Sequence, residues 1–600
     1  MKNIFKTTSA LLIIGAMTAG SLHTSFAAYD REIELPKAVL NWNVEYQTID
    51  GFGVSQACDV YADQIYNFGE RDTVMDLLFS KENGVGFSIM RSEIGAGQNM
   101  PTIHPDKDTW DYTPYEPEQW VMKEARNRGV ETFMSTVWSP PVWMKTNGKI
   151  NYGGRLKKEY YGEYAKYLAN YVKGYDKHHN IKIDAVSIAN EPEFPAQWQS
   201  CLWSSSEFAE FVGEYLKPEF EKENLDIKII VGEEATWTDS RLSEVYGDSK
   251  ALAGVDIIGS HYYHGKPATF DLAKFNNKRV WETEVSDTFG KSTDFKDGVY
   301  WSRQVSDFMT KSEANAFLYW LGAAYKKNNE SLIRLQDDGS YIAAKRLFSI
   351  GNFSKFVRPG FVRVSVDENP TGNLHLSAFK NPSTGEFAIV AVNDGQNNES
   401  ISLDFNGVST GQLTPNITND KYDLEEFPEI PVYNNKVNLS VSGYTTITYV
   451  GRENSETPEK KDFTIIDDLD DWSKIATRSE NWKLDSNNPY NAFDHDLHRA
   501  IRTTTKREYI TYELENMSSF EADIYYYKDL DGLTFEISKD NESWTEINYN
   551  QSTPILTGGF WERVTVTSDF DFEEGTKYLR VVFDKGSESW DKNLATIRIK

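Results

Sequence analysis

The sequence has 600 residues, of which 39% are hydrophobic and 26% charged, and its formal net charge is −28. That length exceeds what one hydrophobic core serves, so we expect two or three domains. The acidic balance argues against nucleic acid and membrane surfaces as partners, and we expect a monomer. Cys58 and Cys201 are the only cysteines. Disulfides are therefore not the scaffold, and the sequence leaves open whether these two pair.

Residues 1–28 have the pattern of a secretory signal peptide. Lys2 and Lys6 give a positive start, Leu11–Ala19 is apolar, and Ser25-Phe26-Ala27 resembles a cleavage site. The apolar stretch is too short to span a bilayer. We therefore expect a secreted, extracellular protein.

From Tyr46 to about Trp320, apolar β-rich runs alternate with amphipathic helical stretches. The expected strands are Tyr46–Phe52, Val85–Arg91, Glu131–Trp138, Ile183–Asn190, Ile227–Gly232, Val255–His261, Lys278–Glu284 and Ala314–Trp320. Helical spacing marks Arg71–Phe79, Glu116–Arg128, Lys157–Lys177 and Ser205–Lys222. This alternation predicts a (β/α)8 barrel over residues 46–358. The alternative, an open doubly wound sheet, lacks a Gly-rich phosphate loop after its first strand.

Beyond Pro359 the pattern changes to short strands separated by polar turns. Residues 359–451 predict a β-sandwich side domain, to which the N-terminal segment 29–45 contributes. Residues 452–462 contain no large apolar side chain and predict a linker. Residues 463–600 are strand-rich again and predict a separate C-terminal β-sandwich domain.

Two carboxylates stand at the ends of predicted barrel strands, where barrel enzymes carry their catalytic groups. Glu191 follows the fourth strand and Glu284 ends the seventh. Such a pair is what glycoside hydrolysis needs, with one group protonated and the other ionised. We assign Glu191 as acid/base and Glu284 as nucleophile. Glu193 and Glu282 are interpreted as structural, because Pro192 already ends one strand and Glu282 lies deeper than Glu284.

Four longer motifs carry a family resemblance. They are Ile49-Asp50-Gly51-Phe52-Gly53, Ser139-Pro140-Pro141-Val142-Trp143-Met144-Lys145-Thr146-Asn147, Asn190-Glu191-Pro192 and Phe353-Ser354-Lys355-Phe356-Val357-Arg358-Pro359-Gly360. The sequence resembles glycoside hydrolase family 30 over Ala38–Val450, and most of all its bacterial xylanase branch. The resemblance implies a cofactor-free, retaining endo-β-1,4-xylanase acting on plant cell-wall xylan and xylo-oligosaccharides. It also places the acid/base on strand four, the nucleophile on strand seven, and the side domain within the catalytic module.

Aromatic and amide residues at other strand ends suit a sugar-binding cleft. Trp138 and Trp143 are expected to wall the cleft, and Trp320 to lie beneath the reacting sugar. Asn190 is expected to hydrogen-bond the 2-hydroxyl group, a contact that strengthens in the transition state.

Charged and phenolic residues are expected around the nucleophile. Arg91, at the end of strand two, is expected to keep Glu284 ionised. One of His261, Tyr262 and Tyr263, at the end of strand six, is expected to hydrogen-bond Glu284.

One stretch departs from the family pattern. Glucuronoxylan-specific members carry an arginine pair just beyond the tryptophan of strand eight, whereas this chain has Ala323 and Ala324 there, followed by Lys326 and Lys327. Alanine cannot clamp a carboxylate, and lysine does not replace a bidentate arginine. We therefore expect cleavage that does not depend on glucuronate branches. The alternatives are a glucuronoxylan-specific enzyme, a xylobiose-releasing exo-enzyme, and an inactive carbohydrate-binding protein.

The C-terminal domain resembles discoidin-like and carbohydrate-binding modules in one hairpin, Phe535–Trp544. Its candidate sugar platforms, at least half of which we expect in the core, are Trp472, Trp482, Trp544, Trp561 and Trp590. A structural calcium is one interpretation of the acidic cluster Asp467, Asp468, Asp470 and Asp471, and a solvated acidic turn is the favoured one.

Overall fold

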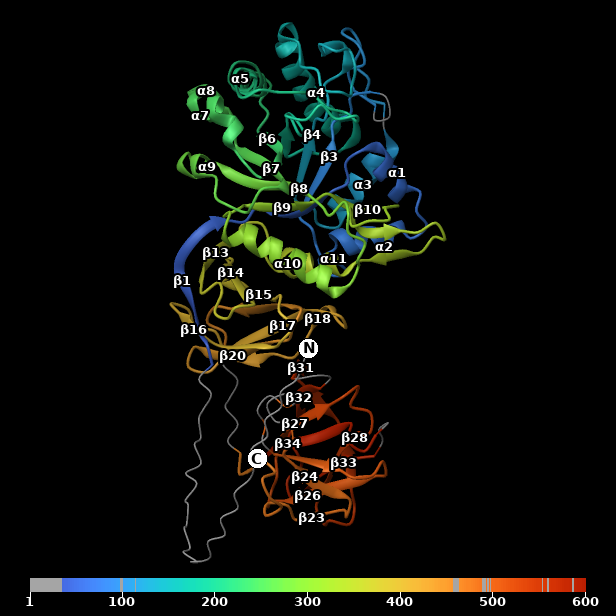
Figure 1. Ribbon diagram of the computed structural model, residues 1–600, viewed down its shortest axis with the longest axis vertical. Coiled ribbons are helices and arrows are strands. Elements are labelled where there is room, and N and C mark those ends of the chain that lie inside the picture. The colour runs from blue at the N-terminus through green and yellow to red at the C-terminus, as the bar shows by residue number, and fades with distance from the viewer. Residues whose placement is uncertain are drawn as a thin grey trace, which may run out of the picture. The chain divides into compact units, whose positions relative to one another are not determined.

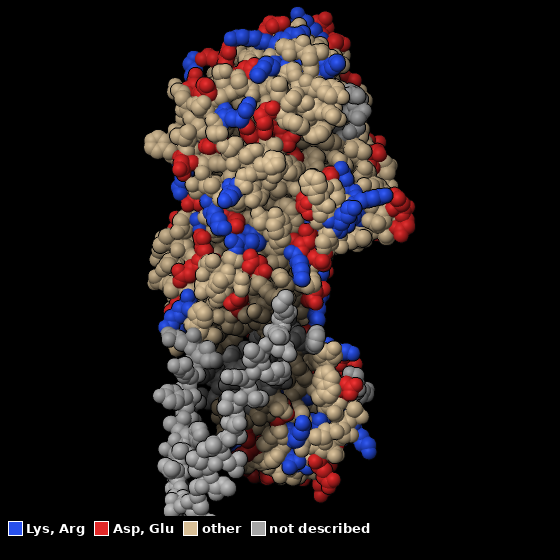
Figure 2. Space-filling model, in the orientation of Figure 1, with Lys and Arg blue, Asp and Glu red and all other residues tan. Residues whose placement is uncertain are grey.

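The computed structural model describes residues 35–97, 101–113, 115–456, 463–487, 493, 496, 498–552, 554–557, 561–584 and 588–600 (Figure 1). The predicted signal peptide and residues 457–462 of the predicted linker lie outside these ranges. Within them, no helix is both long enough and apolar enough to cross a membrane. Acidic and basic side chains are interspersed over the face shown in Figure 2 rather than separated by sign.

Eight parallel strands close into a barrel and follow one another in chain order. Their bounds are β2 (Gly51–Ser55), β3 (Ile89–Glu93), β4 (Thr132–Thr136), β5 (Ala185–Ser187), β6 (Lys228–Thr236), β7 (Ile257–His264), β8 (Arg279–Val285) and β9 (Ala316–Tyr319). The ring closes because β9 pairs in parallel with β2. The predicted (β/α)8 barrel is confirmed.

Helices connect the barrel strands. Their bounds are α1 (Asp59–Tyr66), α2 (Arg71–Phe79), α3 (Glu116–Asn127), α4 (Tyr161–His179), α5 (Ser205–Phe211), α6 (Lys217–Lys222), α7 (Ser243–Gly247), α8 (Ser249–Gly254), α9 (Asp271–Phe275), α10 (Phe295–Thr310) and α11 (Lys345–Ser354). Short 3-10 turns occur at η1 (Val142–Met144), η2 (Lys158–Tyr160) and η4 (Ser240–Leu242), and a π-helical turn at η3 (Val212–Leu216). The helix expected over 205–222 is thus divided by η3 into α5 and α6.

An apolar layer fills the barrel interior. It consists of Ile89, Met134, Ala185, Ile230, Ile257, Trp281, Ala316 and Leu318. Trp281 is almost fully buried, and its indole Nε1 donates a hydrogen bond to Asp50 Oδ2 at 2.8 Å. Ile89 and Trp281 precede Arg91 and Glu284 on their strands. The layer therefore supports the polar groups at the C-terminal rim from below.

The side domain is a ten-stranded sheet in the order β18-β17-β21-β15-β14-β13-β1-β16-β20, with β19 paired to β17. The strands are β1 (Lys37–Thr48), β13 (Val362–Val366), β14 (Leu374–Lys380), β15 (Glu386–Asn393), β16 (Glu399–Asn406), β17 (Gln412–Thr418), β18 (Asp423–Glu426), β19 (Ile430–Pro431), β20 (Lys436–Val441) and β21 (Thr445–Arg452). It is tied to the barrel by α11, where Asn352 Nδ2 donates to Asn416 O at 2.9 Å.

The first predicted strand was misplaced. We expected Tyr46–Phe52 in the barrel, but Tyr46–Thr48 belongs to β1, which pairs with β13 and β16 of the side domain. The barrel strand begins only at Gly51, after Ile49 and Asp50. Two strands of different sheets follow one another so closely here that the apolar pattern reads as one run.

After β9 the chain forms a small sheet at the barrel rim. Its strands are β10 (Leu321–Ala324), β11 (Ser331–Leu335) and β12 (Tyr341–Ala343). Ala323 and Ala324 are fully buried within β10. Their small side chains are therefore part of the packing and do not face a substrate.

The C-terminal domain contains two antiparallel sheets. Its strands are β22 (Ile465–Asp467), β23 (Thr477–Arg478), β24 (Trp482–Asp485), β25 (Arg499–Arg502), β26 (Glu508–Glu513), β27 (Phe520–Tyr526), β28 (Leu533–Ser538), β29 (Thr545–Ile547), β30 (Tyr549–Gln551), β31 (Ile555–Leu556), β32 (Glu562–Ser568), β33 (Tyr578–Phe583) and β34 (Lys592–Ile599). The expected separate all-β domain is confirmed. Trp482 is buried in its core, whereas Trp590 is 43% exposed.

The acidic cluster of this domain accepts hydrogen bonds from its own surroundings. Asp467 accepts from the backbone N–H of Leu469 and, at 2.9 Å, from the Tyr512 hydroxyl. Asp468 accepts from the Thr596 hydroxyl. Asp468, Asp470 and Asp471 are exposed, as a solvated acidic turn requires, whereas Asp467 is fully buried at the end of β22. The structural calcium stays a prediction. Elsewhere in the chain, no disulfide joins Cys58 to Cys201.

A buried carboxyl outside the rim makes stability depend on pH. Glu118, on α3, is buried and accepts a hydrogen bond from the Tyr175 hydroxyl at 3.0 Å. Burial, reinforced by the nearby carboxylate of Glu93, raises the pKa of Glu118 to about 8. The pKa of Glu118 in the folded protein lies above its value in the unfolded chain. Its contribution to the stability of the folded state is therefore fully present below pH 4.5, where the carboxyl is protonated in both states. That contribution is lost as pH rises towards 8.

We predict that Glu118→Gln flattens the loss of stability between pH 5 and pH 8. One proton bound only in the folded state changes the unfolding free energy by about 1.4 kcal/mol per pH unit at most. Melting temperatures across this range provide the measurement. Glu159→Gln, at an exposed site, should keep the wild-type slope, and an equal slope in Glu118→Gln would contradict the prediction.

Candidate active site

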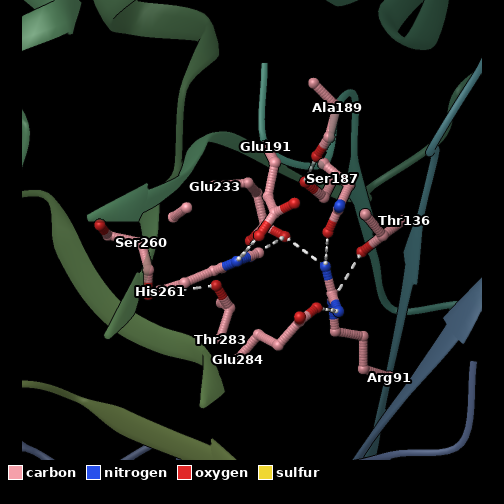
Figure 3. A network of polar contacts seen from close by, with 12 residues as sticks. Arg91, Thr136, Ser187, Ala189, Glu191, Glu233, Ser260, His261, Thr283 and Glu284 are labelled. Atoms are coloured by element: carbon pink, nitrogen blue, oxygen red, sulfur yellow. Dashed lines mark hydrogen bonds and ion pairs between the residues drawn. The ribbon is translucent and has the colours of Figure 1, made fainter. Parts of the chain in front are cut away.

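The C-terminal ends of the barrel strands bring a set of polar side chains together (Figure 3). Arg91 comes from β3, His261 and Tyr263 from β7, and Glu284 from β8. Asn190 and Glu191 come from the loop that directly follows β5. All of them were expected at this rim from sequence.

Glu191 and Glu284 face each other across the rim. One carboxylate oxygen of each lies within 4.8 Å of the other and of a ring nitrogen of His261. Their side chains are 13% and 7% exposed, respectively. The two carboxylates are thus close together, and both are reachable from solvent through a cleft.

Arg91 is the fully buried centre of this arrangement. Its Nη1 donates to Glu284 Oε2 at 2.5 Å. Its Nη2 donates to Asn190 Oδ1 at 2.7 Å and to Glu233 Oε2 at 2.8 Å. Burial would lower the pKa of Arg91, but the carboxylates of Glu233 and Glu284 outweigh it and raise that pKa. A permanent cation therefore lies beneath both Glu284 and Asn190.

Tyr263 completes the environment of Glu284. Its hydroxyl donates to Glu284 Oε1 at 2.9 Å, while Arg91 contacts the other oxygen. Both oxygens of Glu284 are thus held by donors from two other strands. The sequence placed His261, Tyr262 and Tyr263 at the end of the sixth barrel strand, which is β7. Of these three, Tyr263 makes the hydrogen bond to Glu284.

Glu233 was missed from sequence. It follows Gly232 on β6 at a register shift, and its backbone has a positive φ of 63°. Its carbonyl accepts the N–H of Glu191 at 2.9 Å, which places the loop bearing Glu191. Burial would raise the pKa of Glu233, but Arg91 and His261 outweigh it and hold that pKa below its ordinary value. The sequence feature that could have identified Glu233 is its position as an acidic residue directly after the apolar run 227–232.

His261 lies between two carboxylates. Its Nε2 is 3.4 Å from Glu233 Oε2, and its Nδ1 is 3.7 Å from Glu191 Oε1. Burial would lower the pKa of His261, but Glu284, Glu191 and Glu233 outweigh it and raise that pKa to about 10. The raised pKa favours the charged ring, whose two nitrogens face the carboxylates of Glu233 and Glu191.

Glu193 and Glu282 make structural contacts. Glu193 Oε1 accepts the backbone N–H of Ala235 at 2.8 Å. Glu282 is fully buried and accepts the backbone N–H of Glu284 and of Leu318. Burial raises the pKa of Glu282 well above its ordinary value. Neither residue lines the cavity that contains Glu191 and Glu284.

The cavity that contains both carboxylates, called the catalytic cleft after the role proposed for it below, has a volume of about 520 Å³. Its lining comprises Cys58, Tyr61, Trp138, Asn190, Glu191, Trp198, Gln199, Tyr263, Glu284, Thr288, Trp320, Lys326 and Glu330. Trp138 and Trp320 lie side by side with ring centroids 6.1 Å apart. The indole of Trp138 also stacks on the Arg91 guanidinium, 4.5 Å from its Cζ. Two aromatic rings thus border the carboxylate pair.

Trp143 does not line the cleft. Its Nε1 donates to the carbonyl of His104 at 3.1 Å, and its ring packs edge-on against Tyr160. Tyr262 lies at the neighbouring cavity, with its ring edge-on to Phe308. Trp143 is thus separated from the carboxylate pair, whereas Tyr262 shares its cavity with Glu191.

The donor set at the rim has the composition of a metal site, since Glu191, His261 and Glu284 converge. The raised pKa of His261 opposes this use, because an imidazolium has no lone pair to donate. The absence of a cofactor remains a prediction.

Comparisons with known proteins agree with this geometry. The profile of glycosyl hydrolase family 59 matches residues 49–335. The glucuronoxylanase XynC of Bacillus subtilis (strain 168) is 26% identical over 427 residues, which are 68% of this chain and 90% of that protein. The galactocerebrosidase of Salmo salar is 23% identical over 331 residues, covering 52% of this chain and 46% of that protein.

Two solved structures are similar over the same region. The catalytic domain of GH30 xylanase C from Talaromyces cellulolyticus superposes with a TM-score of 0.64 at 28% identity, covering 69% of this chain and 99% of that one. The GH30 subfamily 8 xylanase Xyn30A from Clostridium acetobutylicum gives 0.60 at 26% identity, covering 70% and 100%.

Barrel, carboxylate pair and comparisons together define a glycoside hydrolase. Within that class, the resemblance to family 30 that the motifs indicated is confirmed. The chain has the family 30 fold of a barrel with an attached β-domain, followed here by a further all-β domain.

We predict that Arg91→Met lowers the free energy of unfolding by about 3–5 kcal/mol, because it leaves Glu233 and Glu284 buried without their cation. Arg155→Met is the control, since Arg155 pairs with Glu207 on the surface and is 45% exposed. That control should cost less than about 1 kcal/mol. Urea unfolding followed by fluorescence measures both, and equal losses would contradict the central role of Arg91.

Proposed function

We propose that this chain is a secreted, retaining endo-β-1,4-xylanase, with Glu191 as acid/base and Glu284 as nucleophile. The observation that carries the proposal is the approach of their carboxylate oxygens to within 4.8 Å. Retaining glycosidases hold their two carboxyl groups about 5–5.5 Å apart, whereas inverting enzymes leave about 6.5–9.5 Å for a water molecule.

The first step forms a glycosyl-enzyme. A carboxylate oxygen of Glu284 attacks the anomeric carbon, and the bond from that carbon to the glycosidic oxygen breaks. Glu191 transfers its proton to the departing oxygen, which leaves as an alcohol. Arg91 and Tyr263 each donate a hydrogen bond to Glu284 and orient it towards the sugar.

The second step releases the sugar. Glu191, now a carboxylate, accepts a proton from a water molecule whose oxygen attacks the anomeric carbon, and Glu284 departs. Two inversions restore the original configuration. His261 lies beside Glu191, with its Nδ1 3.7 Å from Glu191 Oε1.

Asn190 is suited to the sugar 2-hydroxyl group. Its amide oxygen already accepts a hydrogen bond from Arg91, so its NH₂ group is left to donate into the cleft. A hydrogen bond to the 2-hydroxyl that strengthens in the transition state adds to the rate.

Xylan is proposed as substrate because the similar proteins include a glucuronoxylanase and two GH30 xylanases. Independence from glucuronate is proposed because Ala323 and Ala324 are buried in β10. Lys326, which does line the cleft, lies 2.5 Å from Glu330 and is thereby neutralised. Because Lys326 lines the cleft, a glucuronate-recognising enzyme is the second candidate function.

The C-terminal domain is proposed to bind carbohydrate. Trp590 offers an exposed ring with Tyr527 at 5.4 Å and Trp561 at 5.9 Å between ring centroids. Trp544 is less suited, because the Arg580 guanidinium already stacks on it with its Cζ at 3.6 Å from the ring.

We predict opposite products when azide rescues the two glutamate variants. On an aryl β-xylobioside, Glu284→Gly with azide should give the α-azide by direct attack. Glu191→Gly should first form the glycosyl-enzyme and then give the β-azide. Each variant without azide should lose at least about 10³-fold in kcat on xylan. NMR of the azides gives the assignment, and Glu193→Gly, which should give neither azide, is the control. Exchanged products would reverse the two roles.

We predict that reducing the glucuronate carboxyls of xylan to alcohols changes kcat/KM by less than about threefold. A charge-assisted bond of roughly 1.5–3 kcal/mol would be worth about 10–150-fold if it acted in the transition state. Rates and product lengths on native and reduced xylan provide the measurement. If reduction collapses the rate and Lys326→Met has the same effect on native xylan, the second candidate replaces the first.

A further inference from the structure

Three aromatic side chains gather at one edge of a sheet in the C-terminal domain. Tyr527 directly follows β27, Trp561 directly precedes β32, and Trp590 lies two residues before β34. The strand β27 lies between β32 and β34 and pairs antiparallel with both, so its end is beside their starts (Figure 1). Three segments far apart in sequence thus bring their rings together. We call Tyr527, Trp561 and Trp590 the aromatic platform.

The loop that carries Trp590 is tied to its surroundings by the residue after it. The carboxylate of Asp591 lies 3.4 Å from Nη2 of Arg502, and both side chains are buried. The carbonyl of Asp591 accepts the backbone N–H of Tyr527 at 3.0 Å. Two rings of the platform are therefore held in fixed relation before any ligand arrives. Such preorganisation lowers the entropy lost on binding.

The rings of the platform are inclined to one another. The planes of Tyr527 and Trp590 meet at 48°, and those of Trp561 and Trp590 at 65°. Three rings at these angles cannot all lie flat against one plane. The face of crystalline cellulose is such a plane, because its chains are flat ribbons packed side by side. The platform is therefore poorly matched to that surface.

A single β-1,4-xylan chain matches the platform better. Xylose lacks the hydroxymethyl group whose hydrogen bonds flatten cellulose, so the xylan chain twists and successive sugar rings face different directions. Inclined aromatic rings can each meet the apolar face of a different sugar in such a chain. The ring centroids, 5.4 Å and 5.9 Å apart, are separated by about the length of one xylose unit.

The charges beside the platform are of both signs. Asp529 and Asp591 lie 3.8 Å and 3.6 Å from the ammonium of Lys592. The ammonium of Lys528 lies 5.5 Å from the ring centroid of Tyr527. Because acidic and basic groups alternate here, the site has no strong field of one sign, which suits a neutral main chain.

We propose that the aromatic platform binds a single, twisted β-1,4-xylan chain and not the flat face of crystalline cellulose. The choice of xylan rests on the proposed function. The angles between the rings carry the choice of a separate chain over a crystalline surface.

The test measures binding of the full chain carrying Glu284→Gln, so that the polymer is not consumed. Sedimentation with insoluble xylan and with microcrystalline cellulose gives the two affinities, and we expect that for xylan to be at least about tenfold higher. Trp590→Ala and Tyr527→Ala should each weaken binding to xylan by about tenfold, since buried aromatic anchors carry most of a binding energy. Trp590→Tyr, which keeps a ring, should restore most of that loss.

The matched control is Phe570→Ala. Phe570 is 50% exposed in the same domain and lines a different cavity, formed by the β28–β29 hairpin and the loop after β32. This variant should bind xylan as the parent does. A loss in Phe570→Ala with unchanged binding in Trp590→Ala would move the site to that cavity and overturn the proposal.

The outcomes also separate the platform from the proposed function. Equal affinities for xylan and cellulose, or equal binding by Trp590→Ala, Tyr527→Ala and Phe570→Ala, would overturn the platform while wild type still hydrolyses xylan. A wild-type protein that hydrolyses no xylan overturns the proposed function, whereas xylan binding that is lost in Trp590→Ala still supports the platform. Melting temperatures within a few degrees of the parent exclude loss of folding as the cause of weaker binding.

Discussion

The active rim depends on one buried cation. Arg91 contacts Glu284, Glu233 and Asn190, which come from three different parts of the barrel rim. A guanidinium removed from water must be met by carboxylates and acceptors in fixed geometry, because an unpaired buried charge is costly. The same requirement fixes the positions of those acceptors. The pairing of Arg91 thereby fixes the relative positions of Glu284, Glu233 and Asn190.

This arrangement gives the two carboxylates of the candidate site, Glu191 and Glu284, different surroundings. Glu284 is held on one oxygen by Arg91 and on the other by Tyr263. Glu191 stands further out, beside the imidazolium of His261, at a residue with a positive φ of 44°. Glu233 connects the two halves, since it pairs with both Arg91 and His261. These different surroundings support the different roles proposed for the two glutamates.

The sequence predicted the barrel and the carboxylate pair because both leave local signals: β-branched runs, and acids at strand ends. What it missed depends on contacts between distant segments. Tyr46–Thr48 was placed in the barrel because β1 and β2 follow one another almost without a break. Glu233 was missed because a register shift on β6, which no residue pattern marks, turns it towards Arg91. Trp143 was misplaced because its indole N–H is satisfied by a carbonyl 39 residues away.

The balance of charge within the cavities bears on specificity. At the cleft wall Lys326 is already paired with Glu330, so a substrate carboxylate must compete with a protein carboxylate for the same ammonium. Such an exchange returns little net energy, because one ion pair is broken for each one formed. The neighbouring cavity has the carboxylates of Glu191 and Asp287 in its lining and no lysine or arginine among its described residues. Under the proposed function, sugars are therefore distinguished by stacking and by hydroxyl contacts such as the one proposed for Asn190, that is, by shape and linkage rather than by charge.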